Sequence, residues 1–382
     1  MVMHDVIDGA PSEVWALAHT PPPVNGMTLL TAEVVRALKQ AGPVVFCNFS
    51  PERRQVNIRA RISRIMRSLD CVGKLIWNGR VENARLYIAS NSRAGLISTA
   101  LMVWLGQRLG YRVYLHHHAY SYIDTHNRWM AWIDRCMGDR GVHVVHCDKM
   151  VGDFRNQYPT RCEFMIIHPS AVSIEIGRPR TSVNKPLRLG MLSNLMIAKG
   201  VDLAIETFEA LRAKGRDVRL KLAGPIFRRP AQDCIDSALK LYPDAIDYVG
   251  PVYGEEKARF LRDIDVFLFP TRYPAESWGI VINEALAAGA PVITINRGCT
   301  ATVVGDRAGL VVPRDGDYVA AAAQQIEHWM DLPQQFLAAS QAAIEQAQHL
   351  HQHGSRQLED FAEHMFSRCD GFTSVGKQPS TN

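Results

Sequence analysis

Two glutamates spaced eight residues apart, Glu276 and Glu284, are the side chains in this sequence best suited to chemistry. Residues 267–269 and 291–295 have the composition of short strands, and residues 280–288 have that of a helix ending at Gly289. Glu276 then lies in the loop before the helix. Glu284 lies about two turns further on, near the same face.

The loop after Glu276 could bind a phosphate. The N–H groups of residues 277–280 begin the helix without partners inside it, and Gly279 would let an anion approach the backbone. Glu284 could then accept hydrogen bonds from ribose hydroxyls, and Glu276 from sugar hydroxyls. The plainer alternative is a helix with one acid at its start and another on its exposed side.

Three consecutive histidines, His116, His117 and His118, follow an expected strand at 112–116. They could indicate a metal, but neighbouring residues of a strand face opposite sides, so all three cannot easily bind one ion. One or two of these side chains could face a cleft, where they would donate to a sugar hydroxyl or phosphate or act as a base. A purely structural role is the other interpretation.

A glycine-containing loop at 19–28 joins an expected strand at 14–18 to an expected helix at 29–40. Loops at the carboxyl ends of parallel strands are where ligands collect. Gly26 could let a ligand approach, with Asn25 and Thr28 as polar lining. An ordinary tight turn explains the same residues without a ligand.

Six arginines fall between Arg53 and Arg67, among isoleucines at helical spacing. Such a basic amphipathic helix could lie on an anionic membrane. The alternative is a domain helix with its apolar stripe in the core and its arginines in solvent. The net charge of +5 is spread along the chain, which permits anionic ligands or membranes but does not indicate nucleic acid.

The composition favours a large protein of a reducing compartment. The 382 residues suffice for two domains, and the longest apolar stretch, 94–106, is too short to span a bilayer. The first residues lack a signal pattern. The eight cysteines are scattered, so we expect buried thiols. The expected location is cytoplasmic, or peripheral at the inner face of the membrane.

Strand and helix patterns alternate through both halves of the chain, which predicts two doubly wound parallel sheets. In the first half we expect strands at 14–18, 44–48, 85–89 and 112–116, and a single helix at 124–137. A segment rich in glycine, proline and charge separates the halves. We expect a first domain at 1–172, a linker at 173–186, a second domain at 187–350, and a helix end with a disordered tail at 351–382. Two such domains imply a cleft between them.

Short segments of the second half occur in a fixed order: KGVD at 199–202, LAGP at 222–225, YVG at 248–250, DVFLFPT at 265–271, ESWGIVINEALAAGAPV at 276–292 and AGLVV at 308–312. Together they resemble the donor-binding domain of retaining glycosyltransferases with the GT-B fold, specifically glycosyltransferase family 4. The resemblance covers about residues 187–330. The first half matches only in layout, with a glycine loop after its first strand and a histidine at the end of a middle strand.

The resemblance implies an α/β protein of two Rossmann-like domains facing a central cleft. Its activity would be transfer of a sugar, with retention and without a metal or other cofactor, from a UDP- or GDP-linked donor to a glycan, lipid-linked or protein acceptor. Lys199 and the amides at 277–280 would meet the diphosphate charge. By position, the catalytic residues would be His118, Glu276 and Lys199; the donor site Asn194, Lys199, Val252, Glu276, Ser277, Trp278, Gly279, Ile280 and Glu284; and the acceptor and phosphate loop Asn25, Gly26, Thr28 and His116.

One departure from the family pattern concerns Asn194, which stands five residues before Lys199, where the family usually has an arginine. The diphosphate then lacks one expected cation, which Arg272, Arg297 or an arginine of the first domain could replace. Two alternatives therefore stay open. One is a nucleotide-sugar-binding protein without transfer. The other is a nucleotide-sugar epimerase or hydrolase, against which the paired glutamates argue.

Overall fold

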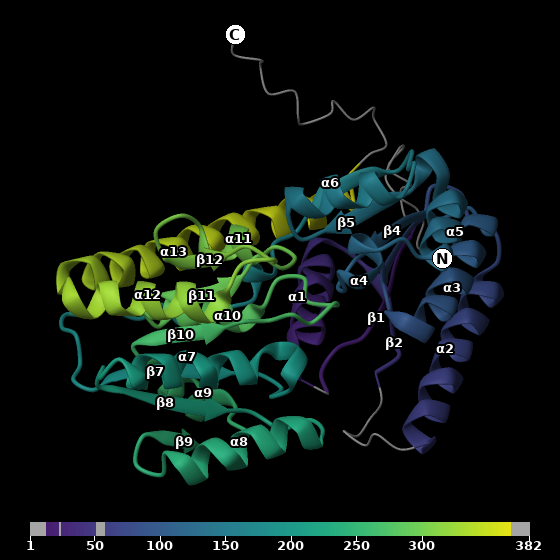
Figure 1. Cartoon of the computed structure of the whole chain (residues 1–382). Coiled ribbons are helices and arrows are strands. Elements are labelled where there is room, and N and C mark those ends of the chain that lie inside the picture. The colour runs from purple at the N-terminus through teal and green to yellow at the C-terminus, as the bar shows by residue number, and fades with distance from the viewer. Residues whose placement is uncertain (1–12, 23, 51–57, 368–382) are drawn as a thin grey trace.

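Two six-stranded parallel sheets form the centre of the protein (Figure 1). The computed structural model describes residues 13–22, 24–50 and 58–367, with side chains at 58–65, 68 and 69 left out. The first sheet contains β1 (Val14–Ala18), β2 (Val44–Asn48), β3 (Arg85–Ala89), β4 (Arg112–His116), β5 (Val142–Val145) and β6 (Glu163–Ile166). The second contains β7 (Leu187–Leu192), β8 (Val218–Ala223), β9 (Ile246–Tyr248), β10 (Val266–Phe269), β11 (Val292–Ile295) and β12 (Gly309–Val312).

Helices bury both faces of the first sheet: Trp15 and Leu17 of β1 join one apolar cluster, and Val14 and Ala16 join another on the opposite face. The helices of the first half are α1 (Gly26–Ala41), α2 (Ile58–Asn78), α3 (Leu96–Arg108), α4 (Ser121–Asp124), α5 (Arg128–Met137) and α6 (Asp148–Gln157). Those of the second half are α7 (Val201–Ala213), α8 (Arg229–Leu241), α9 (Gly254–Asp263), α10 (Ile280–Ala287), α11 (Thr300–Val304), α12 (Tyr318–Asp331) and α13 (Pro333–His364).

The strand orders create a crevice in each half. The first sheet runs β2-β1-β3-β4-β5-β6 and the second β9-β8-β7-β10-β11-β12. The direction of strand addition therefore reverses between β1 and β3, and again between β7 and β10. Loops leave such a switch point in opposite directions, and ligands of open parallel sheets bind outside the carboxyl ends of the strands there.

The predicted fold class, two doubly wound parallel sheets, is confirmed. The strands expected at 14–18, 44–48, 85–89 and 112–116 coincide with β1 to β4. The single helix expected from 124 to 137 is wrong, because the chain is extended at Asn127 and two helices replace it. The Asn127 side chain accepts hydrogen bonds from the N–H groups of Trp129 and Met130, at 2.9 and 3.3 Å, and so starts α5 as its N-cap.

The last helix, α13, contacts both halves of the chain. Its early turns hold Ser340, whose hydroxyl donates to the Gly289 carbonyl. Its later turns cross the domain boundary expected at residue 350 and pack against η3 (Pro169–Ala171), where Gly354 leaves no room for a side chain. A Cβ there would lie 2.7 Å from the Ala171 nitrogen. The later turns of α13 are therefore packed against the first half.

The predicted basic helix is only partly described. Residues 51–57 lie outside the described residues, as do the arm at 1–12 and the tail at 368–382, while α2 begins at Ile58. α2, α3 and α5 lie together at the edge of the first half (Figure 1). Over the described residues, none of the helices combines the length and apolar character needed to cross a bilayer.

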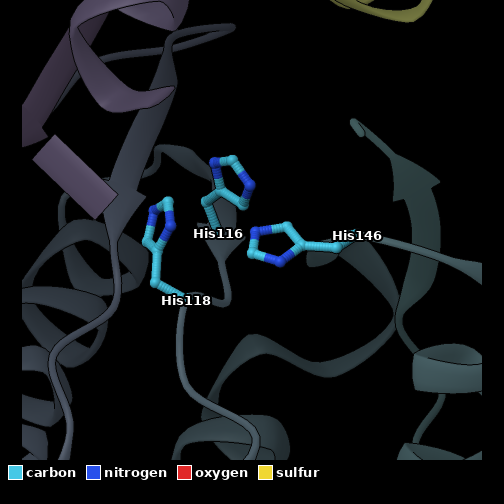
Figure 2. A group of neighbouring side chains, drawn as sticks. All are labelled: His116, His118 and His146. Carbon is cyan, nitrogen blue, oxygen red and sulfur yellow. The ribbon is translucent and has the colours of Figure 1, made fainter. Parts of the chain in front are cut away.

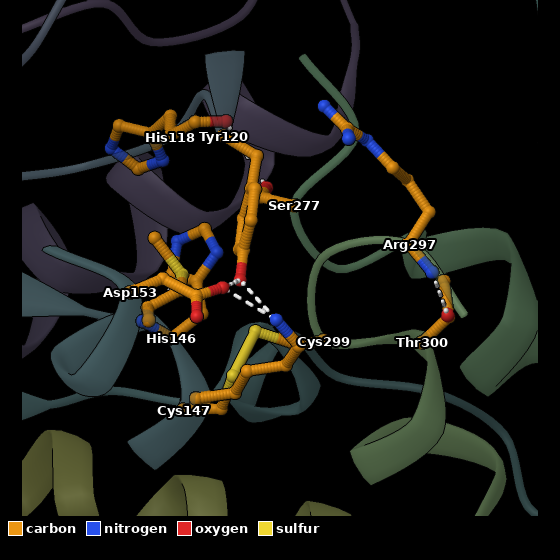
Figure 3. The surroundings of a disulfide bond; sticks show 11 residues. His118, Tyr120, His146, Cys147, Asp153, Ser277, Arg297, Cys299 and Thr300 are labelled. Atoms are coloured by element: carbon orange, nitrogen blue, oxygen red, sulfur yellow. Dashed lines mark hydrogen bonds and ion pairs between the residues drawn. A yellow bond between two sulfur atoms is a disulfide. The ribbon is translucent and has the colours of Figure 1, made fainter. Parts of the chain in front are cut away.

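The cysteine prediction is wrong for one pair, because Cys147 and Cys299 form a disulfide bond. The bond joins the start of α6 in the first half to the start of α11 in the second (Figure 3). The two residues are 152 positions apart, and only the docking of the two halves brings them together. Among the described residues, the remaining cysteines, at positions 47, 71, 136, 162 and 234, are free thiols.

Candidate active site

One cavity of about 350 Å³ opens between the two halves, at the carboxyl ends of both sheets. Loops after β1, β4 and β5 line it from one side, and loops after β7, β8 and β10 line it from the other. Every residue that the sequence predicted for the site lines this cavity except Thr28 and His116. The two switch points therefore face a common space.

Lys199 and Glu276 form an ion pair inside the cavity. Lys199 lies in a short turn before α7, and Glu276 lies in the loop before α10. Their side chains are 14% and 10% exposed, so water screens the pair only weakly. The Lys199 ammonium also lies 4.9 Å from the centre of the Tyr273 ring. The ion pair therefore places one cation and one anion in the cavity at the carboxyl ends of the second sheet.

Glu284 forms a second ion pair, with Lys257 of α9. Sequence reasoning missed Lys257, although it lines the same cavity. Its position gave no signal, because α9 is an amphipathic helix with several exposed charges and no motif. The pair shows that Glu284 faces the cavity from α10 and that a lysine from a neighbouring helix balances its charge.

The loop before α10 has the geometry expected for close approach of a ligand. Gly279 is the N-cap and has a left-handed conformation, with φ of 74°. A Cβ there would lie 3.1 Å from the Phe269 ring. Both facts favour glycine. Ser277, Trp278 and Ile280 line the cavity around it, and the first N–H groups of α10 have no partners within the helix.

The first half supplies Asn25 and Gly26 at the start of α1. Asn25 is the N-cap: its side chain accepts from the Thr28 N–H at 3.0 Å, and the Thr28 hydroxyl accepts from the Asn25 N–H at 3.1 Å. Thr28 therefore caps the helix and is buried beneath the cavity lining. A Cβ on Gly26 would lie 3.2 Å from the Ile280 side chain, so this glycine also lets the two halves approach.

The histidines divide between two faces of the first sheet. His116 and His118 point to one side and meet His146, which follows β5 (Figure 2). His117 points to the other side, where its Nε2 lies 2.8 Å from the His143 Nδ1. The alternation predicted for consecutive strand residues is therefore present. His146 was missed, because only the folding of the sheet places it beside the other two.

These rings are neutral. Burial, aided by nearby His19, lowers the pKa of His118 to about 3. Burial is also the main reason that the pKa values of His116 and His146 lie well below their usual range. His118 lines the cavity, and its carbonyl accepts a hydrogen bond from the Ser277 hydroxyl at 3.1 Å. A neutral imidazole can both donate and accept a hydrogen bond to a sugar hydroxyl.

Asn194 lies at the cavity as expected, but neither suggested arginine compensates for it. Arg272 is paired with Asp202, and Arg297 is paired with Asp124 and the Pro274 carbonyl. Among the described residues, the cations that line the cavity are both lysines, Lys199 and Lys257. Lys257 is thus the second cation of the site in place of an arginine.

We expect the protein to lose stability in mild acid because of His168. Its ring packs against Trp278, with centroids 4.9 Å apart, and burial, aided by His353, lowers its pKa to about 4. Below pH 6.5 the unfolded chain takes up a proton that the folded ring resists, so the free energy of unfolding falls between pH 6.5 and 4. For this ring alone the loss by pH 5 is on the order of 2 kcal/mol.

Denaturant unfolding between pH 7.5 and 5 measures this effect. A His168→Phe variant keeps an aromatic ring against Trp278 but cannot be protonated. Its stability should depend less on pH than that of the parent protein. Equal pH slopes for the two proteins would exclude His168 as a source of acid sensitivity.

Two doubly wound parallel-sheet domains that meet across a cavity at their switch points define the GT-B class of fold. Solved structures agree. Sucrose-phosphate synthase from Thermosynechococcus elongatus superposes with a TM-score of 0.66 and 16% identity, over 92% of this chain and 99% of that one. HepE from Anabaena, in complex with UDP and glucose, gives a TM-score of 0.63 and 14% identity, over 91% of this chain and 99% of that one.

The second domain carries the sequence relationship. Residues 186–331 match the family model of "Glycosyl transferases group 1". The capsular polysaccharide biosynthesis glycosyltransferase CapM of Staphylococcus aureus is 30% identical over 142 residues, 37% of this chain and 36% of CapM. The GDP-mannose-dependent alpha-(1-6)-phosphatidylinositol monomannoside mannosyltransferase of Mycobacterium tuberculosis is 31% identical over 180 residues, 41% of this chain and 45% of that protein. The match to each of these relatives thus spans less than half of its length.

Proposed function

We propose that the protein is a retaining glycosyltransferase that moves a sugar from a nucleotide-diphosphate donor to a hydroxyl acceptor. Protein groups, and no bound metal, would meet the charge of the diphosphate. One observation carries the proposal: a single cavity between the domains gathers Lys199, Glu276 and Glu284 around the start of α10. The group 1 relationship of the second domain supports it.

The diphosphate would lie between Lys199 and the start of α10. Without a donor, the Lys199 ammonium is held by Glu276. A phosphate would give that ammonium a second anionic partner, while the helix N-terminus supplies N–H donors on the other side. The Lys199 ammonium and these N–H groups are in place before the reaction begins. Groups preorganised in this way stabilise the charge that develops on a departing phosphate.

The nucleoside would extend from there toward α9. Glu284 would accept hydrogen bonds from the ribose hydroxyls, and Lys257 would balance its charge so that it does not repel the diphosphate. Val252 and Tyr253, which line the same end of the cavity, would contact the base. UDP- and GDP-linked sugars are the donors we expect.

The reacting centre would lie between Glu276 and His118. Glu276 would bind the donor sugar, and the neutral His118 would contact a sugar hydroxyl at the anomeric side. Gly26 and Asn25 would border the acceptor. His116 lies behind His118, and the centroids of the two rings are 4.2 Å apart. It would support the reacting histidine without touching the sugar.

Calorimetric titration with UDP-, GDP- and dTDP-sugars, followed by transfer assays on glycan and lipid-linked acceptors, tests the proposal. We expect one nucleotide class to bind and its sugar to be transferred. The anomeric configuration of the product, measured by NMR, tests retention. Absence of binding for all nucleotide sugars would refute the proposed function. An inverted product would refute only the retaining mechanism.

Binding without transfer is the second candidate, and Asn194 favours it because the side chain at this position adds no charge to the cavity. We expect Asn194→Arg to tighten donor binding about tenfold, the effect of one added charge-assisted hydrogen bond. Asn194→Gln is the matched control, because it lengthens the side chain without adding charge. Titration of both variants with the donor measures the difference. Equal affinities would mean that Lys199 and Lys257 already neutralise the diphosphate.

Peripheral contact with an anionic membrane accompanies the proposal if the acceptor is lipid-linked. Exposed apolar side chains on the described parts of α2, α3 and α5 support it, namely Met66, Ile76, Trp77, Ile97, Leu101, Trp104, Trp129 and Trp132. Sedimentation with anionic and neutral vesicles measures this contact. The disulfide removes the support that free thiols were expected to give to a cytoplasmic location, which stays a prediction.

A further inference from the structure

We propose that His116, His118 and His146 form a binding site for one divalent transition-metal ion of the zinc class. Each side chain offers one ring nitrogen, and the three nitrogens lie within 4.8 Å of one another. Figure 2 shows the three rings grouped at the ends of two neighbouring strands, two from the β4 side and one from the β5 side. Three imidazoles are the ligand set of many protein zinc sites.

The unsatisfied nitrogens are the main reason for the proposal. Nε2 of His116, Nε2 of His118 and both ring nitrogens of His146 are buried without a hydrogen-bond partner. His116 and His146 are 0% and 2% exposed, so water does not compensate them. A buried polar atom without a partner destabilises a protein, because it loses its hydrogen bonds to water and gains none in return. An ion bound by all three rings would satisfy one nitrogen of each ring, which is three of these four atoms.

A buried tyrosine orients one of the rings. The Tyr87 hydroxyl lies 2.7 Å from Nδ1 of His116. When Nδ1 carries the proton and donates to Tyr87, Nε2 presents its lone pair to the cluster. Such an outer partner is what fixes the tautomer of a metal-binding histidine. The hydrogen bond to Tyr87 is thus compatible with the tautomer that a ligand needs.

A second group of possible ligands, Asp134, His143 and Cys162, shows the contrast. His143 uses Nε2 for Asp134 at 3.0 Å and Nδ1 for His117 at 2.8 Å. Cys162 donates to the Gly138 carbonyl at 3.0 Å. The polar atoms of this group already have hydrogen-bond partners, so an ion is not needed to satisfy them. The unpaired nitrogens distinguish the His116 cluster.

The geometry suits a four-coordinate ion with one open position. A tetrahedral zinc with three histidine ligands brings their nitrogens to about 3.3 Å from one another, so the rings would move inward slightly. His118 and His146 line the cavity, and the fourth position would therefore face it. A water or an oxygen of a bound molecule would complete the coordination.

Binding of the ion would remove His118 from the reacting centre; this consequence rests on the proposed function. The ring that coordinates the ion cannot also bind a sugar hydroxyl through the same nitrogen. Zinc would therefore inhibit transfer, and a chelator would restore it. The site itself does not depend on transfer, because metal binding is measured directly.

Competition with a chromophoric zinc chelator tests the site in the full-length protein after EDTA treatment and dialysis. We expect one zinc per chain, bound in the micromolar range or tighter. His146→Phe should weaken binding about 10²-fold or more, because it removes one ligand. The control is the double variant His349→Ala/His353→Ala, which removes a stacked pair of histidines on the exposed side of α13 and should leave binding unchanged.

Tyr87→Phe gives a variant that keeps the core shape. It should weaken zinc binding about 10–100-fold, the usual effect of losing an outer-shell partner. Cobalt substitution adds a direct readout, because a tetrahedral cobalt complex absorbs strongly in the visible range and this absorption should disappear in His146→Phe. Equal zinc affinity of the parent protein and His146→Phe, or loss of binding only in the His349→Ala/His353→Ala variant, would overturn the proposal. Tight binding without inhibition would refute only the competition for His118.

Discussion

Replacing Lys199 with alanine is expected to lower the rate of sugar transfer by about 10²–10³-fold, the effect of removing one fixed electrostatic stabiliser. Lys199 is one of the two cations at the cavity in the described part of the chain. Its side chain is only 14% exposed, so water cannot replace the lost charge efficiently. The alanine variant leaves the diphosphate opposite Glu276 without the ammonium that separates them.

Two further variants make this result specific. Lys199→Arg keeps a positive charge beside Glu276 and should retain more activity than the alanine variant. Lys240→Ala removes an exposed lysine from α8 and should behave like the parent protein. Rates are measured at saturating donor, with donor affinity measured separately. A near-normal rate for Lys199→Ala would mean that Lys257 or another group carries the diphosphate.

Loss of the Cys147–Cys299 bond is expected to lower the free energy of unfolding by about 5 kcal/mol, because the bond closes a loop of 152 residues. The double variant Cys147→Ser/Cys299→Ser should therefore unfold at a markedly lower urea concentration. Cys234→Ser, at a half-buried free thiol of α8, is the control and should change stability little. Figure 3 shows why the bond matters for the site: His146 immediately precedes Cys147.

Thiol counting separates the bond from the packing of the two side chains. In denaturant without reductant, the parent protein and the double serine variant should show the same number of free thiols, because the two cysteines removed are not thiols. Two additional thiols in the parent protein would mean that the bond does not form. The stability difference would then have to come from side-chain packing.

Local sequence patterns were sufficient to predict the sheets and the paired glutamates of the site, whereas Lys199, Asn194 and Val252 were expected only from the family resemblance. Strands β1 to β4 consist of short apolar runs between polar turns, and such runs are readable without tertiary contacts. The segment from Glu276 to Glu284 is similarly self-contained. One loop and one helix fix the positions of both carboxylates, so their common orientation toward the cavity follows from spacing alone.

Partners from distant parts of the chain could not be predicted in this way. Lys257 reaches Glu284 from another helix, His146 joins His116 from the neighbouring strand, and Cys147 meets Cys299 across the two domains. Each contact depends on which loops the folded sheets bring together. No spacing rule within one segment contains that information. The helix start at Asn127 was missed because an asparagine can either lie within a helix or cap a new one. Here its side chain caps α5.

The long final helix sets a mechanical condition on opening of the cavity. Ser340 is bonded to Gly289 in the second domain, while Ser170 of the first domain donates to the Leu350 carbonyl and packs against Gly354. The two ends of α13 are therefore attached to different domains. Gln346 also belongs to the second-domain attachment, because its side chain donates to the Thr302 and Val303 carbonyls. Separation of the two domains must therefore bend α13 between Gln346 and Leu350 or break one of these attachments. The stiffness of this short helical span therefore opposes opening of the active-site cavity. A substitution in the span would change how far the two domains separate, although no residue there lines the cavity.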